Sequence, residues 1–171
     1  MGLSEGRVAV PRETGPEFED FFRLEYPRLV RALYLVTGSR VEAEDLAQEA
    51  MARVFERWER LRASQSPEGY LYRVGMNLNR NRLRRVRLAA RREDQLADRL
   101  HSSATSDLHA DVIRALRALP IGQRQVLVLT EWLRMSAEEA GVILGIKASS
   151  VRARLSRARV AFRERIGDDY A

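Results

Sequence analysis

The chain has 171 residues, of which 45% are hydrophobic and 32% charged, and only five are prolines. This composition excludes a disordered chain and leaves long stretches free to form helices. The absence of cysteine excludes disulfides and thiolate chemistry, and two isolated histidines do not make a metal site. The net charge of +6 favours a polyanion as partner. A solvated basic surface produced by codon bias toward arginine is the alternative.

The first 38 residues divide into two parts. Residues 1–16 carry glycine and proline without helical periodicity, so we expect a flexible leader there. From Phe18, large apolar residues recur at intervals of three, four and seven as far as Val36, which predicts an amphipathic helix that ends at Gly38.

The second predicted helix begins after Ser39, which suits an N-cap. Acidic residues fill its first turns, where the helix dipole favours them. Its buried stripe is expected at four-residue steps, through Leu46, Ala50, Val54 and Trp58. We therefore place Trp58 in the core.

The third helix is predicted over 68–92 and changes character along its length. Its first part packs through Leu71, Val74 and Leu78. Its second part carries arginines and no acidic residue, namely Arg80, Arg82, Arg84, Arg85, Arg87, Arg91 and Arg92. Such a block needs a phosphate backbone or open water around it. Residues 93–107 are polar and serine-rich, which is typical of a flexible linker between two domains.

A second domain is predicted over 108–167, followed by a short tail over 168–171. Its first helix ends at Pro120, and the next, over 123–133, is so rich in apolar residues that we expect it at the centre of a small core, with Trp132 inside. The longest strongly apolar run, 126–129, is too short to span a bilayer. We therefore expect no membrane insertion and a cytoplasmic protein.

A helix-turn-helix follows in this second domain. Ser136 and Glu139 form a capping box for a short helix, and Gly145 supplies the tight turn after it. Gly141 must be small because the two helices cross over it. Four apolar side chains are expected to hold the helix pair at its angle, namely Ala140, Leu144, Ile146 and Val151.

The last helix, predicted over 149–166, buries one face and carries arginines on the others. Arg152, Arg159 and Arg163 share one stripe. An arginine-covered helix fits the major groove of DNA, where arginine binds both guanine edges and phosphates. A merely solvated basic helix is the alternative. Together the segments predict an all-α fold of two small helical domains joined by a linker.

Two sets of residues resemble one family. The C-terminal set is 119–120, 123–127, 144–146 and 150–159, and the N-terminal set is 43–50, 70–74, 77–78 and 82–85. These resemble regions four and two of the bacterial RNA polymerase sigma factors of the sigma-70 superfamily, in the small extracytoplasmic-function (ECF) group. Ser149 and Arg152 stand where the family usually has glycine and lysine, and Lys147 stands at the usual capping serine.

The resemblance implies partners and site residues. Core RNA polymerase is expected to bind through its beta-prime clamp and beta flap, and an anti-sigma factor is left open as a further partner. The implied clamp-docking residues are Glu42, Asp45, Gln48 and Glu49. Those implied to read and open the minus-ten promoter element are Tyr70, Tyr72, Arg73, Asn77, Arg80, Asn81 and Arg84. Those implied to read the minus-thirty-five element are Ser149, Ser150, Arg152, Ala153, Arg154 and Arg157.

Alternatives stay open for some of these residues. Tyr70 and Tyr72 are equally compatible with packing, and the acidic residues could serve only the helix dipole and solubility. A conventional helix-turn-helix regulator and an all-helical adaptor with a basic surface are the rival functions. No phosphate-binding glycine loop, nucleophile elbow or metal cluster is present in the sequence, so we expect neither catalysis nor a cofactor.

Overall fold

The computed structural model describes residues 16–63, 66–90 and 107–166, and the regular elements in these ranges are all helical. The N-terminal unit consists of α1 (Pro16–Thr37), α2 (Arg40–Phe55), α3 (Trp58–Leu61) and α4 (Pro67–Ala90). The C-terminal unit consists of α5 (Asp107–Arg117), α6 (Ile121–Leu127), the π-helix η1 (Val128–Trp132), α7 (Ala137–Leu144) and α8 (Ala148–Ile166). The predicted all-α fold is confirmed for these ranges, whereas the predicted leader, most of the linker and the tail lie outside them.

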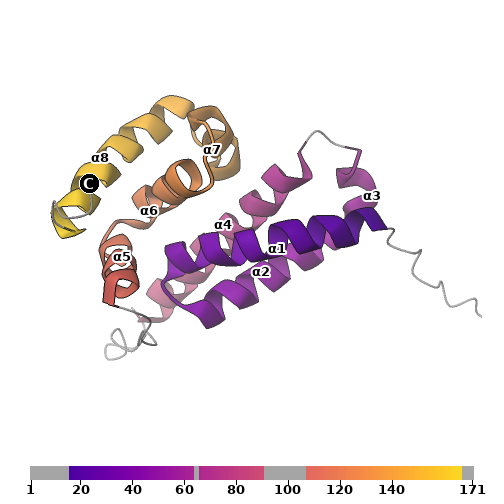
Figure 1. Cartoon of the computed structure of the whole chain (residues 1–171), viewed down its shortest axis with the longest axis horizontal. Coiled ribbons are helices and arrows are strands. Elements are labelled where there is room, and N and C mark those ends of the chain that lie inside the picture. Colours follow the sequence, from indigo (N-terminus) through magenta and orange to yellow (C-terminus); the bar gives the residue numbers. More distant parts are fainter. Residues whose placement is uncertain (1–15, 64–65, 91–106, 167–171) are drawn as a thin grey trace, which may run out of the picture.

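Local signals place the helix ends in the N-terminal unit. Gly38 has a φ of 73°, a conformation that suits glycine, and it ends α1. Ser39 then caps α2, since its hydroxyl accepts a hydrogen bond from the backbone N–H of Glu42 at 3.4 Å, as predicted. The chain can therefore fold back within two residues, so that α1 and α2 pack side by side (Figure 1).

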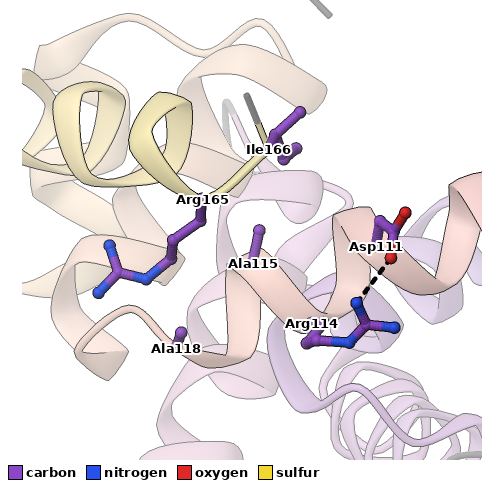
Figure 2. A pocket seen from close by; sticks show the side chains of 6 residues that line it. All are labelled: Asp111, Arg114, Ala115, Ala118, Arg165 and Ile166. Atoms are coloured by element: carbon purple, nitrogen blue, oxygen red, sulfur yellow. Dashed lines mark hydrogen bonds and ion pairs between the residues drawn. The ribbon is translucent and has the colours of Figure 1, made fainter. Parts of the chain in front are cut away.

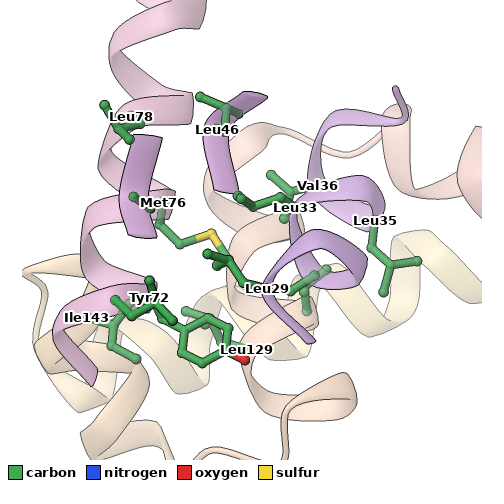
Figure 3. Close-up of a cluster of buried hydrophobic side chains, with 14 of the residues drawn as sticks. Leu29, Leu33, Leu35, Val36, Leu46, Tyr72, Met76, Leu78, Leu129 and Ile143 are labelled. Atoms are coloured by element: carbon green, nitrogen blue, oxygen red, sulfur yellow. The ribbon is translucent and has the colours of Figure 1, made fainter. Parts of the chain in front are cut away.

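The core of the N-terminal unit lies between α1, α2 and α4 (Figure 3). The predicted packing residues Leu71, Val74 and Leu78 are buried, and so is Trp58, which confirms its place in the core. Burying each large apolar side chain contributes about 1.5–3 kcal/mol relative to leaving it in water. This packing fixes which sides of α2 and α4 remain available to partners.

Trp132 does not lie in the core, and that prediction is wrong. Its side chain is 53% exposed, although the preceding Val128 and Leu129 are buried. The reason is the π-helical turn in η1, in which the backbone N–H of Leu133 bonds to the carbonyl oxygen of Val128, five residues back, at 3.1 Å. The wider turn rotates Trp132 off the buried stripe that a regular α-helix would have continued.

The two units pack against each other and share one hydrophobic core (Figure 1). The most extensive contact joins α4 to α7. Buried polar groups also cross the boundary, since the side chain of Gln125 donates to the carbonyl oxygen of Met76 at 3.1 Å and that of Arg124 donates to the carbonyl oxygen of Val36 at 2.6 Å. Burial, together with the charge of Arg117, lowers the pKa of Arg124 to about 10. No helix within the described ranges has the length and apolar character needed to cross a membrane.

Candidate nucleic-acid interface

The helix-turn-helix formed by α7 and α8 has the predicted local geometry. Ser136 accepts a hydrogen bond from the backbone N–H of Glu139 at 3.1 Å, and the Glu139 carboxylate accepts one from the Ser136 backbone N–H at 2.7 Å. Gly145 ends α7 with a φ of 67°. A Cβ atom placed on Gly141 would lie 2.7 Å from the carbonyl oxygen of Ile146, so the turn passes directly over this glycine. Glycine at position 141 thus allows the close approach that fixes the angle between α7 and α8.

The α8 helix buries two of its predicted packing residues, Val151 and Ala158, and half-buries Leu155 and Phe162. Its other faces carry five exposed arginines, which are Arg152, Arg157, Arg159, Arg163 and Arg165. The remaining predicted minus-thirty-five residues are exposed at Ser149 and Ala153 and half-buried at Ser150 and Arg154. All six therefore lie on one helix, and four of them are exposed.

Acidic side chains from earlier elements pair with two of these arginines. Arg152 donates to Glu138, at the start of α7, at 2.9 Å. Arg159 donates through its Nε to Glu131 in η1 at 3.0 Å. The hydrogen bond from Arg152 and one from a backbone N–H lower the pKa of Glu138 below its usual range, so this carboxylate is charged at neutral pH. Sequence reasoning missed both acids, because no local spacing rule links residues 14 or 28 positions apart.

The α4 helix separates the predicted minus-ten residues into accessible and buried positions. Exposed side chains are those of Arg73, Arg80, Asn81 and Arg84, while Tyr70 and Asn77 are half-buried. Tyr72 is completely buried, and its hydroxyl donates to Glu25 at 3.2 Å. We therefore remove Tyr72 from the DNA-reading set, because its ring packs in the core between the two units (Figure 3).

Tyr70 has a neighbour that the sequence did not indicate. Arg57, just before α3, donates to the Tyr70 hydroxyl at 2.5 Å, and its guanidinium carbon lies 5.9 Å from the ring centroid. An aromatic ring with a cation beside it can bind an unstacked base together with a phosphate. The two positions are 13 residues apart and α3 lies between them, so helical periodicity alone could not bring them together.

The second half of α4 is strongly basic. Arg80, Arg84, Arg85 and Arg87 are all exposed, and none forms an ion pair within the described ranges. Arg80 instead donates to the side chain of Asn77 and, at 3.4 Å, to the carbonyl oxygen of Leu144 in the C-terminal unit. The predicted block also includes Arg91 and Arg92, which lie outside the described residues. The exposed guanidinium groups on α4 suit a phosphate backbone.

The predicted clamp-docking residues of α2 do not all face solvent. Asp45, Gln48 and Glu49 are exposed, and Glu49 pairs with Arg53 on the same helix at 2.6 Å. Glu42 is instead paired with Arg82 of α4 at 2.9 Å, and its side chain is only 13% exposed. Glu42 therefore joins α2 to α4, and the other three residues form the open part of this surface.

A shallow cleft between α5 and the end of α8 lies apart from these surfaces (Figure 2). It is lined by Asp111, Arg114, Ala115, Ala118, Arg165 and Ile166. Its charged groups are already engaged, since Arg114 pairs with Asp111 at 2.7 Å and Arg165 donates to the carbonyl oxygen of Ala161 at 2.6 Å. This arrangement does not suggest acid–base chemistry. The described residues also contain no group of three histidine or acidic side chains that could hold a metal ion.

Comparisons with known proteins match both units. The family model described as sigma-70 region 2 matches residues 21–88, and the model described as sigma-70, region 4 matches residues 109–162. The RNA polymerase sigma-E factor of Streptomyces coelicolor is 34% identical over 153 residues, which cover 88% of this chain and 86% of that protein. The ECF RNA polymerase sigma factor SigE of Mycolicibacterium smegmatis is 33% identical over 160 residues and covers 87% and 61%, respectively.

Solved structures share the arrangement of helices. The sigma factor RpoE of Bartonella quintana, crystallised with the anti-sigma factor NepR, superposes with a TM-score of 0.76 and 22% identity over 90% of this chain and 98% of that one. CnrH, in complex with the cytosolic domain of CnrY, superposes with a TM-score of 0.60 and 22% identity over 86% and 85%. At this identity the two structures support the fold.

Proposed function

The chain belongs to the sigma-70 family of RNA polymerase sigma factors, in its ECF group, and we propose that it directs core polymerase to promoters through both of its helical units. The observation that carries this proposal is the presence of regions 2 and 4 in order, each with an exposed arginine-rich helix. Helices of this kind supply both phosphate contacts and base contacts. Chemistry is left to the polymerase, so the protein itself needs neither catalytic residues nor a cofactor.

In this proposal α8 reads the minus-thirty-five element. The first residues of a recognition helix reach base edges in the major groove. Ser149, Ser150, Arg152 and Ala153 occupy that part of α8, Arg154 follows directly, and Arg157 lies about one turn after Ala153. A well-placed bidentate arginine contributes about 1–3 kcal/mol of discrimination between bases.

The minus-ten element is proposed to bind along α4. The set is now Tyr70, Arg73, Asn77, Arg80, Asn81 and Arg84, with Arg57 added beside Tyr70. Opening the duplex exposes an unstacked base. Stacking of that base on an aromatic ring contributes about 1–3 kcal/mol and can replace the stacking lost in the duplex. The arginines of α4 would hold the adjacent phosphates.

Polymerase is proposed to dock on the open acidic surface of α2, formed by Asp45, Gln48 and Glu49, with Glu42 supporting it through Arg82. The beta-prime clamp would bind there and the beta flap on the C-terminal unit. We infer domains over 17–92 and 108–167, with 93–107 as the linker that lets each reach its own element. A cytoplasmic location follows from these partners, and an anti-sigma factor fits the same proposal.

The test is transcription from a genomic library with purified core enzyme, followed by mapping of the start sites. We expect transcripts with aligned start sites and two shared upstream elements. The double variant R152A/R154A should lose at least about tenfold in promoter use, since it removes two candidate base contacts. The matched control R23A/R114A removes the same charge from exposed positions on α1 and α5.

A folded protein that yields no promoter-specific transcript would refute the proposal. Binding to a palindromic operator without polymerase would instead identify a conventional regulator, so gel shifts are run with and without core enzyme. Promoter use that survives R152A/R154A unchanged would favour the adaptor.

A further inference from the structure

We propose that Glu138 is a positioning residue that fixes the Arg152 guanidinium for base reading and thereby sets specificity at one position of the minus-thirty-five element. This inference rests on the proposed function of α8. It concerns a residue on α7, outside the recognition helix. The ion pair between the two helices carries the argument.

The helix end that carries Glu138 is held in place. Glu138 is the second residue of α7, between Ser136 and Glu139, whose reciprocal hydrogen bonds anchor this helix end. The tight crossing at Gly141 in turn fixes α7 against α8. A guanidinium held by this carboxylate is therefore held relative to the whole helix-turn-helix.

The position of Arg152 suits base reading better than phosphate binding. It is the fifth residue of α8, within the part of a recognition helix that reaches base edges. Its Nη1 donates to Glu138 at 2.9 Å, which leaves Nη2 and Nε for other acceptors. Two adjacent N–H donors match the O6 and N7 atoms of guanine. A guanine is therefore the base that we expect this arrangement to select.

Arg152 differs in this respect from the other candidate residues on α8. Of the six predicted minus-thirty-five residues, it is the one that forms an ion pair with an acid in the described ranges. Among the described residues, Arg157 donates along its own helix, to the carbonyl oxygen of Ala153 at 3.2 Å. A phosphate contact tolerates a mobile side chain, whereas a bidentate base contact needs a fixed plane. The pair thus marks Arg152 as the base reader.

The negative charge of the Glu138 carboxylate also affects DNA binding directly. A negative charge at the DNA surface opposes phosphate binding, so its removal should strengthen binding to unrelated sequences. The same removal frees the Arg152 side chain to contact phosphates. Loss of Glu138 should therefore raise non-specific affinity and lower discrimination, a combination that general destabilisation of the fold does not produce.

The experiment measures binding of the polymerase holoenzyme to the promoter and to every single-base variant of its minus-thirty-five element. The proteins compared are the wild type, E138Q, E138D, R152A, E138Q/R152A and the control E164Q. Glu164 is an exposed acid on α8 without an ion pair in the described ranges, so E164Q changes the net charge equally. E138D keeps a negative charge at the start of α7 but is too short to maintain the same contact with Arg152.

We expect E138Q and E138D to lower discrimination at one base pair by about tenfold, on the scale of a single bidentate contact. E138Q should also raise affinity for unrelated DNA, and E164Q should leave the discrimination profile unchanged. In the R152A background, E138Q should have no further effect on discrimination. Melting temperatures identify any variant that has simply unfolded. If E138Q unfolds, E138D still tests the proposal.

Three results would overturn the inference. One is an unchanged profile in E138Q and E138D while R152A alters it. Another is an E138Q effect that persists in the R152A background at a cytosine, which would mean that Glu138 reads the base itself. The third is an equal loss of discrimination at every position of the minus-thirty-five element. If R152A itself leaves promoter binding unchanged, the assignment of Arg152 under the proposed function fails instead, so the two failures are distinguishable.

Discussion

A methyl group on Gly141 would meet backbone, and one on Gly122 would meet only the end of a flexible side chain. The added Cβ would lie 2.7 Å from the carbonyl oxygen of Ile146 in the first case and 3.2 Å from Nη1 of Arg154 in the second. We predict that G141A lowers the free energy of unfolding by about 1–3 kcal/mol, as overpacking does. G122A should be neutral or stabilising by up to about 1 kcal/mol through helix propensity. Urea unfolding of both variants decides this, and equal stabilities would contradict it.

Glu139 makes the stability of the helix-turn-helix depend on pH. Its hydrogen bonds with Ser136 lower its pKa in the folded protein below the usual value of 4.5, while the nearby charge of Glu138 opposes this. The depressed pKa means that the stabilisation is present above the unfolded-state value and is lost as the pH falls through the folded-state value. The difference in melting temperature between the wild type and E139Q should therefore shrink between about pH 6 and pH 3. A difference that is constant over this range would contradict the assignment.

These residue-scale features were accessible from the sequence because each is local. The Ser39 cap, the capping box and the glycine turn involve side chains within four residues of the backbone groups that they bind. The pairs Glu138–Arg152 and Arg57–Tyr70 were not accessible. Their partners meet only after separate helices have packed.

At the scale of elements, α4 shows why periodicity alone misplaced a residue. Leu71, Val74 and Leu78 follow the stripe that packs within the N-terminal unit, and all three were predicted correctly. Tyr72 lies outside that stripe, yet it is buried because α7 covers a second side of α4. Helical periodicity within one unit does not report burial by the other unit, so this wider buried arc could not be predicted from the sequence. The π-helical turn of η1 misplaced Trp132 for a different reason, a local departure from the regular helical period.

This division of α4 makes a prediction about its two tyrosines. Y72F removes a hydrogen bond to the buried carboxylate of Glu25, which Arg28 also holds at 2.9 Å, so it should cost about 1–3 kcal/mol of folding stability. The folded variant should still open promoters. Y70A should show the opposite pattern, with melting close to that of the wild type and weaker promoter opening. Thermal melts and permanganate footprinting measure the two effects, and normal opening by Y70A would remove Tyr70 from the proposed site.

At the scale of the whole molecule, the buried contacts between the units should make unfolding cooperative. The chain has two tryptophans, Trp58 in the N-terminal unit and Trp132 in the C-terminal unit. In a W132F background, fluorescence reports on Trp58 alone. Gln125 lies in the other unit. Q125A should still lower the midpoint of the unfolding transition that Trp58 reports, with a loss of about 1–3 kcal/mol in stability, because it removes the hydrogen bond to the carbonyl oxygen of Met76 and leaves a cavity.

The matched control for this experiment is Q123A, which changes a half-buried glutamine on the same helix. It should leave the Trp58 transition nearly unchanged. Independent unfolding of the two units, with a Trp58 midpoint that ignores Q125A, would contradict the shared core.

The contact between α4 and α7 also bears on how the free protein meets the chromosome. Arg80 is exposed, but its guanidinium donates both to Asn77 and to the carbonyl oxygen of Leu144 at the end of α7, so under the proposed function a promoter would compete with this contact for two of the candidate minus-ten side chains. Where binding requires the two units to separate, the apparent affinity for DNA is the intrinsic affinity multiplied by the separated fraction, and each 1.4 kcal/mol that favours the packed form lowers it about tenfold. The far larger number of non-promoter sites is disfavoured by the same factor. A partner that holds the units apart would restore the affinity. The packed form would therefore limit DNA binding by the free protein until polymerase binds it.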